Sequence, residues 1–186
     1  MANPEHIEKL DLLDKLSVIT YRTGITLFSL ALCLSSVAIA DDISLILING
    51  PIKEIALIFI ALSSAMSAAN LHVYDKKIRM IITWSAWIGL VLLIQLDNSQ
   101  LLWLPLGFLF VTFSGIALKE SFCFKVMGLK LVPILLCVST FMLALEVWII
   151  PIICFALCGM IFLFLSIQKW RMPLHFDIGN KAYYQN

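Results

Sequence analysis

Long apolar runs separated by short charged stretches make up most of this chain. Crossing the hydrocarbon core of a bilayer takes about 20 apolar residues in a helix. Six runs approach or exceed this length, over residues 18–40, 55–74, 80–96, 101–118, 131–147 and 149–167. The pattern therefore predicts an all-α membrane protein, with a six-helix transmembrane domain over residues 18–168.

Two more polar segments, residues 1–17 and 169–186, flank this domain. In the first, apolar residues recur every third position opposite charged ones, which is typical of an amphipathic helix. Asn3-Pro4-Glu5 is a suitable start for that helix, because an N-cap residue is followed by a proline and an acid. The second segment is predicted to be a polar tail.

The first apolar run also permits a different interpretation. Ala38-Ile39-Ala40 precedes Asp41 and resembles a signal-peptidase site. The stretch before it is long and carries four acidic residues, however: Glu5, Glu8, Asp11 and Asp14. A retained helix is therefore favoured over a cleaved leader.

Lysine and arginine residues alternate in number from one connecting segment to the next. The N-terminal segment, the second loop, the fourth loop and the tail have three each, whereas the first loop has one, Lys53, and the third and fifth have none. Alternate sides of the membrane therefore carry twelve and one. Because basic residues stay on the cytoplasmic side during insertion, both termini are predicted to be cytoplasmic.

The composition agrees with lipid as the solvent of this chain. Hydrophobic residues make up 61% of it and charged residues 13%, whereas a soluble domain is roughly a quarter charged. A net charge of +1 gives no support to nucleic-acid binding through a basic face. Five cysteines scattered through apolar runs do not form a disulfide framework.

Residues that carry chemistry are scarce in the predicted spans. The centres of all six lack Asp, Glu, Lys and Arg, which argues against a proton-coupled pump with a mid-membrane carboxylate. Cys154 and Cys158 share a helix face, but no His or acid lies on the neighbouring turns to complete a metal site. The sequence also has no nucleotide-binding glycine motif and no nucleophile elbow. We therefore predict a chain that is not an enzyme, with no catalytic residues, no metal site and no cofactor.

Small residues recur every fourth position in the second predicted span, as in Ala61, Ala65 and Ala69. Positions four apart share one helix face, and small side chains there let helices approach closely in lipid. This predicts a tightly packed helix. The alternative is a polar path lined by Ser67, Asn70 and His72, which lie towards the inner end of the same helix.

Lys119 and Glu120 begin a segment, residues 119–130, that is too charged to span and too apolar for an ordinary loop. We expect its apolar side chains to lie at the membrane interface. A solvated loop is the favoured interpretation of Lys119 and Glu120. They would otherwise form a pair at the interface, or Glu120 would reach His72.

Three stretches resemble a known family: YRTGIT from Tyr21, GIALKESFCF from Gly115 and PLHFDIGNKAYYQ from Pro173. The family is one of small, uncharacterised integral membrane proteins, a domain of unknown function common in cyanobacteria. The resemblance implies a plasma or thylakoid membrane location and supplies no catalytic residues. All three stretches lie on the predicted inner face, which directs attention to one candidate cluster there: Tyr21, Arg22, Asn70, His72, Lys119, Glu120, His175 and Asp177.

Two functions remain open at this point. The uncharged span centres favour an accessory or assembly subunit of a larger membrane complex. The serine- and asparagine-lined helix favours a small-solute or ion permease. The expected partners are the lipid bilayer and other membrane proteins or a second copy of the chain, with no nucleic acid.

Overall fold

The computed structural model describes residues 9–48, 50–96 and 100–179, and every regular element within them is helical. The long helices are α1 (Leu12–Asp42), α2 (Ile52–Ala69), α3 (Lys76–Leu96), α4 (Trp103–Cys123) and α6 (Ile149–Trp170). A 3-10 turn, η1 (Leu129–Leu131), leads into the shorter α5 (Val132–Ala144), and α7 (His175–Ile178) is a single turn after α6.

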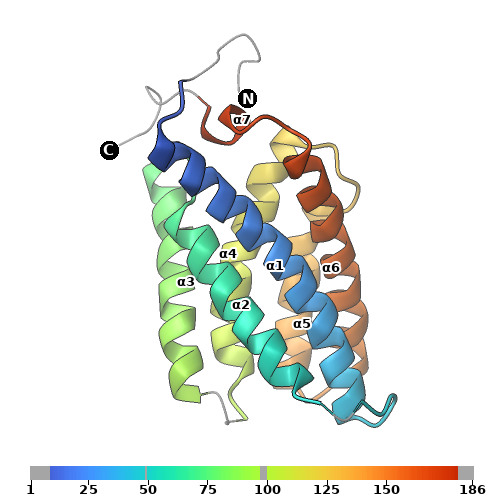
Figure 1. Cartoon of the computed structure of the whole chain (residues 1–186). Helices are drawn as coiled ribbons and strands as arrows, with labels where there is room; N and C mark the ends of the chain where they lie inside the picture. The colour runs from blue at the N-terminus through green and yellow to red at the C-terminus, as the bar shows by residue number, and fades with distance from the viewer. Residues whose placement is uncertain (1–8, 49, 97–99, 180–186) are drawn as a thin grey trace.

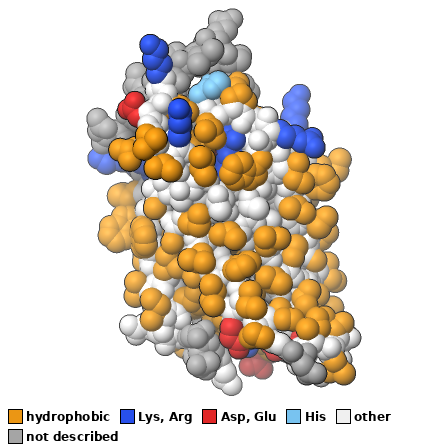
Figure 2. Space-filling view, in the orientation of Figure 1, with side chains coloured by type: hydrophobic (Ala, Val, Ile, Leu, Met, Phe, Trp, Pro, Cys, Tyr) orange, Lys and Arg blue, Asp and Glu red, His pale blue; other side chains and the backbone are white. Residues whose placement is uncertain are grey.

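The helices α1 to α6 form a closed bundle in which sequence neighbours pack against each other (Figure 1). The ring closes because α6 returns to α1, which packs extensively against both α2 and α6. The start of α1, the ends of α4 and α6, and α7 all lie at one end of the bundle (Figure 1). We call this the basic end, because lysine and arginine side chains gather there (Figure 2).

The membrane-spanning character of the fold is confirmed. Within the part of the chain that the structure describes, five helices are long and apolar enough to cross a bilayer, namely α1 to α4 and α6, and the stretch Leu129–Ala144 is a shorter apolar helix. Apolar side chains cover the middle of the visible face of the bundle, and charged ones lie near its two ends (Figure 2). Ile94, Phe164 and Trp84 are among the exposed apolar side chains, at 84%, 58% and 61% of their full area. Such a surface is suited to lipid rather than water.

The first helix begins and ends at different residues from those predicted. Residues 1–8 lie outside the described part of the chain, and with them the predicted start at Asn3-Pro4-Glu5. In the structure Asp11 is the N-cap of α1, in a capping box whose Asp14 carboxylate accepts the Asp11 backbone N–H at 3.0 Å. From there α1 continues without a break through the predicted span, because no proline interrupts residues 12–42.

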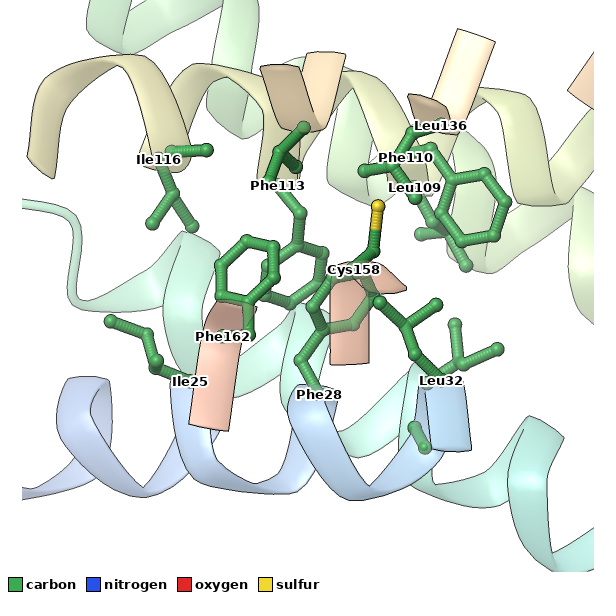
Figure 3. Close-up of a cluster of buried hydrophobic side chains, with 14 of the residues drawn as sticks. Ile25, Phe28, Leu32, Leu109, Phe110, Phe113, Ile116, Leu136, Cys158 and Phe162 are labelled. Atoms are coloured by element: carbon green, nitrogen blue, oxygen red, sulfur yellow. The ribbon is translucent and has the colours of Figure 1, made fainter. Parts of the chain in front are cut away.

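Phenylalanine rings from three helices fill the middle of the bundle (Figure 3). Phe28 of α1 stacks on Phe113 of α4 with ring centroids 3.4 Å apart. Phe162 of α6 meets both edge-on, at 5.0 and 5.9 Å. Phe110 and Phe155 extend this layer towards the opposite end of the bundle. We call these five rings the phenylalanine layer.

Candidate functional site

Buried charges gather at the basic end of the bundle. Arg22 lies on α1, Glu120 in the last turn of α4, Lys169 in the last turn of α6 and Asp177 in α7. Their side chains are only 2–3% exposed. Together with Lys119, next to Glu120, they form what we call the ionic cluster. The buried charges of this cluster need partners, since an unpaired charge costs several kcal/mol in a low-dielectric site.

Arg22 connects the first helix to the segment after the last long helix. Its Nε donates to Oδ2 of Asp177 at 2.7 Å. Its two terminal nitrogens donate to the carbonyl oxygens of Met172 and Pro173, at 2.8 and 3.0 Å. The planar guanidinium thus holds a carboxylate and two backbone acceptors at once. It fixes the path of the chain from α6 to α7 against α1.

Glu120 is the second acid of the ionic cluster. Its Oε1 accepts the hydroxyl proton of Tyr21 at 2.7 Å. Lys169 Nζ lies 3.0 Å from its Oε2, and Lys119 Nζ lies 3.2 Å from its Oε1. Lys169 also donates to Asp177, so this lysine bridges the two acids. The result is a continuous network through α1, α4, α6 and α7.

The ionic cluster has one more cation than anion, since three basic side chains face two carboxylates. The excess is located at Lys119. Its Nζ is buried and has no hydrogen-bond acceptor among the described residues, although it lies near Glu120 and 4.8 Å from the centroid of the Tyr21 ring. Lys169, in contrast, donates to Asp177 and lies against Glu120. Lys119 is therefore the member of the cluster with capacity for a further anionic partner.

His72 lies beside the cluster, in the segment between α2 and α3. Its Nε2 is 3.5 Å from the Ser17 hydroxyl, and its ring meets the Tyr21 ring edge-on with centroids 6.5 Å apart. Burial, reinforced by the positive charge of Lys119, lowers the pKa of His72 from 6.5 to about 4. The imidazole is therefore neutral at pH 7, and its Nδ1 has no partner in the described part of the chain.

A cavity of about 860 Å³ opens beside the ionic cluster. Lys119, Glu120, Lys169 and Asp177 line one part of it, and His72 lies in its wall. A second, smaller cavity of about 460 Å³ lies at the opposite end of the bundle, where Asp42, Lys53 and Glu54 contribute polar groups. The phenylalanine layer lies between the two.

Most of the eight residues predicted for the candidate cluster meet at the basic end of the bundle. Tyr21, Arg22, Lys119, Glu120 and Asp177 join one network, with His72 at its edge. The other two residues, Asn70 and His175, make different contacts in the described part of the chain. Asn70 donates to the Met66 carbonyl of its own helix at 2.9 Å, and the His175 ring packs on Phe176 at 4.6 Å.

The prediction that Lys119 and Glu120 lie in a solvated loop is wrong. The helix α4 continues to Cys123, because Glu120 falls on the same face as Phe113 and Ile116 and is buried with them. Of the two predicted alternatives, the pair of Lys119 and Glu120 is formed, at 3.2 Å. The interaction of Glu120 with His72 is not the one formed, since both oxygens of Glu120 are engaged by Tyr21 and two lysines.

Lys169 is not among the residues predicted for this site, because it begins the segment that is predicted to be a polar tail. A signal was available in the spacing. Phe155, Cys158, Phe162, Leu165 and Lys169 follow one another at intervals of three and four and are all buried. A lysine that continues an apolar stripe is directed into the bundle rather than into water.

The serine stripe of α2 packs against α1. A side chain at Gly24 of α1 would come within 2.4 Å of Ser67 Oγ, so the two helices approach closely here. The hydroxyls of Ser63 and Ser64 donate to the Ile60 carbonyl, within their own helix. This geometry favours the packing interpretation over a polar path along Ser67, Asn70 and His72.

Comparison with known proteins adds a family relationship. A family model described as "Uncharacterized integral membrane protein (DUF2301)" matches residues 66–186. A protein of Haemophilus influenzae described as "Uncharacterized protein" is 37% identical over 185 residues, which cover all of this chain and 99% of that protein. No solved structure matches the chain.

Proposed function

Because the chain belongs to this family of uncharacterized integral membrane proteins, we propose its function from its geometry: it is a non-catalytic accessory or assembly subunit of a membrane complex. The basic end faces the cytoplasm, where twelve of the thirteen lysine and arginine residues are predicted to lie. The plasma or thylakoid membrane is the proposed location.

The observation that best supports this proposal is the phenylalanine layer. Phe28, Phe113 and Phe162 are each 0% exposed and pack ring against ring at the centre of the bundle. The layer separates the two cavities, and the span centres around it carry no charged residue. A solute crossing the membrane would have to displace this layer without any charged group to replace its hydration. The interior is thus that of a structural bundle.

The basic end also has the character of a docking surface. The ionic cluster fixes α1, α4, α6 and α7 relative to one another, so the surface above it is preformed. Next to it, Phe122 in the last turn of α4 and Met127 between α4 and η1 are 73% and 94% exposed. A preformed surface with exposed apolar anchors lowers the cost of ordering that association otherwise carries.

The proposal is tested by purification from native membranes after chemical cross-linking. We expect a specific protein to co-purify with the wild-type chain, and to be lost when Phe122 and Met127 are replaced by serine. The matched control is Ile94→Ser, an equally exposed apolar residue at the far end of α3. If no protein is enriched, or if the control loses the partner as completely as the double variant, the proposal fails.

A small-solute or ion permease is the second candidate, and the pair of cavities at opposite ends of the bundle favours it. In this case the phenylalanine layer is a closed gate. Purified protein in liposomes is expected to conduct little, and Phe113→Ala is expected to increase the flux of small ions strongly. If the protein is instead a subunit without a pathway, neither the wild type nor Phe113→Ala would show flux, and the cross-linked partner would be retained.

A further inference from the structure

We propose that the cavity at the basic end binds an anionic phospholipid, with a phosphate group at Lys119 and hydrocarbon chains along the apolar wall. This inference concerns a ligand of the chain and does not depend on which protein, if any, it assembles with. It rests on three observations: the unmatched cation, the apolar lining, and the level of the cavity along the bundle.

The unmatched cation provides the charge recognition. Lys119 Nζ is buried, belongs to a cluster of three cations and two anions, and donates no hydrogen bond to any described residue. Lys125, which is exposed, lies on the rim of the same cavity and adds a second positive charge. A phosphate oxygen would give Lys119 a charge-assisted hydrogen bond, a stronger interaction than one between neutral groups.

Acidic residues in the cavity wall do not cancel this preference. Glu120 is held by Tyr21, by Lys169 and, at 3.2 Å, by Lys119 itself, and Asp177 is held by Arg22 and Lys169. Asp75, the third acid of the wall, accepts the backbone N–H of Ile78 at 2.9 Å at the start of α3. A singly charged anion would therefore balance the one excess positive charge of the ionic cluster.

The rest of the lining selects an amphiphile rather than a free anion. Apolar atoms make up most of the surface that lines the cavity, with Ile78, Leu118, Phe122 and Phe124 among the contributing residues. Three of these are also exposed on the outside of the bundle: Ile78 at 52%, Leu118 at 45% and Phe122 at 73%. Apolar wall and apolar outer surface are thus continuous, which gives a hydrocarbon chain a path from the cavity to the bilayer.

The cavity also lies at the level where lipid phosphates are found. Lys119 lies four residues before the end of α4, at the end of the bundle that carries the basic side chains (Figure 2). Basic pockets between transmembrane helices on the cytoplasmic side are a recurrent form of headgroup recognition. The charge, the apolar lining and the depth of the cavity therefore all favour an anionic phospholipid as its ligand.

The experiment uses the full chain in a non-ionic detergent, with phosphatidylglycerol, phosphatidylcholine and inorganic phosphate as separate probes. We expect phosphatidylglycerol to stay bound in native mass spectrometry and to raise the thermal unfolding temperature, and the other two probes to do neither. Lys119→Gln is expected to weaken phosphatidylglycerol binding at least tenfold. Lys53→Gln, at the opposite end of the bundle, is the matched control and is expected to bind like the wild type.

A second measurement needs no variant at the site. Cys123 lines the cavity and is exposed, whereas Cys137 is exposed on α5, outside the cavity. Phosphatidylglycerol is expected to slow maleimide labelling of Cys123 severalfold and to leave Cys137 unchanged, whereas phosphatidylcholine changes neither. Equal effects of the two lipids, or equal binding by Lys119→Gln and wild type, would overturn the proposal. An equal effect of inorganic phosphate would replace the lipid by a free-phosphate site and overturn it as well.

Discussion

Replacement of Asp177 by alanine is expected to destabilise the bundle far more than loss of a surface acid. The Asp177 side chain is 3% exposed, and its carboxylate is the acceptor for Arg22 and Lys169, which are both buried. Removal of one partner from a buried ion pair typically costs about 3–5 kcal/mol, because a charge is left uncompensated.

The structure indicates that the loss of stability caused by Asp177→Ala lies near the lower limit of that range. Arg22 keeps its hydrogen bonds to the carbonyls of Met172 and Pro173, and Lys169 keeps Glu120 at 3.0 Å. We therefore expect a loss of about 3 kcal/mol, or roughly a 100-fold change in the unfolding equilibrium. The matched control is Asp42→Ala, since Asp42 pairs with Lys53 at 3.5 Å where both are 54% exposed. That variant is expected to change stability by less than about 1 kcal/mol.

Both variants are compared in mixed micelles, with circular dichroism following unfolding as the fraction of sodium dodecyl sulfate is raised. A double-mutant cycle with Arg22→Met then isolates the Arg22–Asp177 pair. The two losses are expected to be non-additive by about 1–3 kcal/mol, because the second substitution removes the charge left unpaired by the first. Equal effects of Asp177→Ala and Asp42→Ala, together with strict additivity in the cycle, would show that the buried network does not hold α7 to α1.

Three further outcomes are expected. Gly24→Leu should lower stability by about 1–3 kcal/mol, because its side chain meets Ser67 of α2, whereas Gly50→Ala, with open space around it, should be near neutral in the same titration. The pKa of His72 is lowered in the folded chain, so between pH 6.5 and about pH 4 the unfolded chain binds a proton at this residue that the folded chain does not bind. Stability should therefore be constant above pH 6.5 and fall by about 1–2 kcal/mol towards pH 4, allowing for partial solvent access. This part of the pH dependence should vanish in His72→Gln. Reporter fusions at the two termini should both be active in the cytoplasm, and opposite locations would refute the charge-based topology.

Helix type and membrane character were predictable because they depend on composition within each segment. Apolar runs near the length of a bilayer crossing leave few alternatives. The small residues of α2 predicted a tightly packed helix, and α2 does approach α1 closely at Ser67, although the pattern did not identify that partner. These properties can be seen in a window of about 20 residues.

The ionic cluster was only partly predictable, since charge was taken to mark the exit from lipid. For Glu120 and Lys169 this rule gave the wrong environment, because each continues a stripe of buried residues at intervals of three and four. The spacing identifies such side chains as inward-facing, but it does not identify their partners. Arg22 and Asp177 are 155 positions apart, and no local pattern relates them.

That separation has a consequence for how the protein is made. Arg22 enters the membrane with α1 early in synthesis, whereas the acid that neutralises it emerges from the ribosome 155 residues later. In the interval its guanidinium has to remain near the headgroups, where water can solvate it. The buried site of Arg22 is therefore complete only after the sixth helix and α7 have been synthesised.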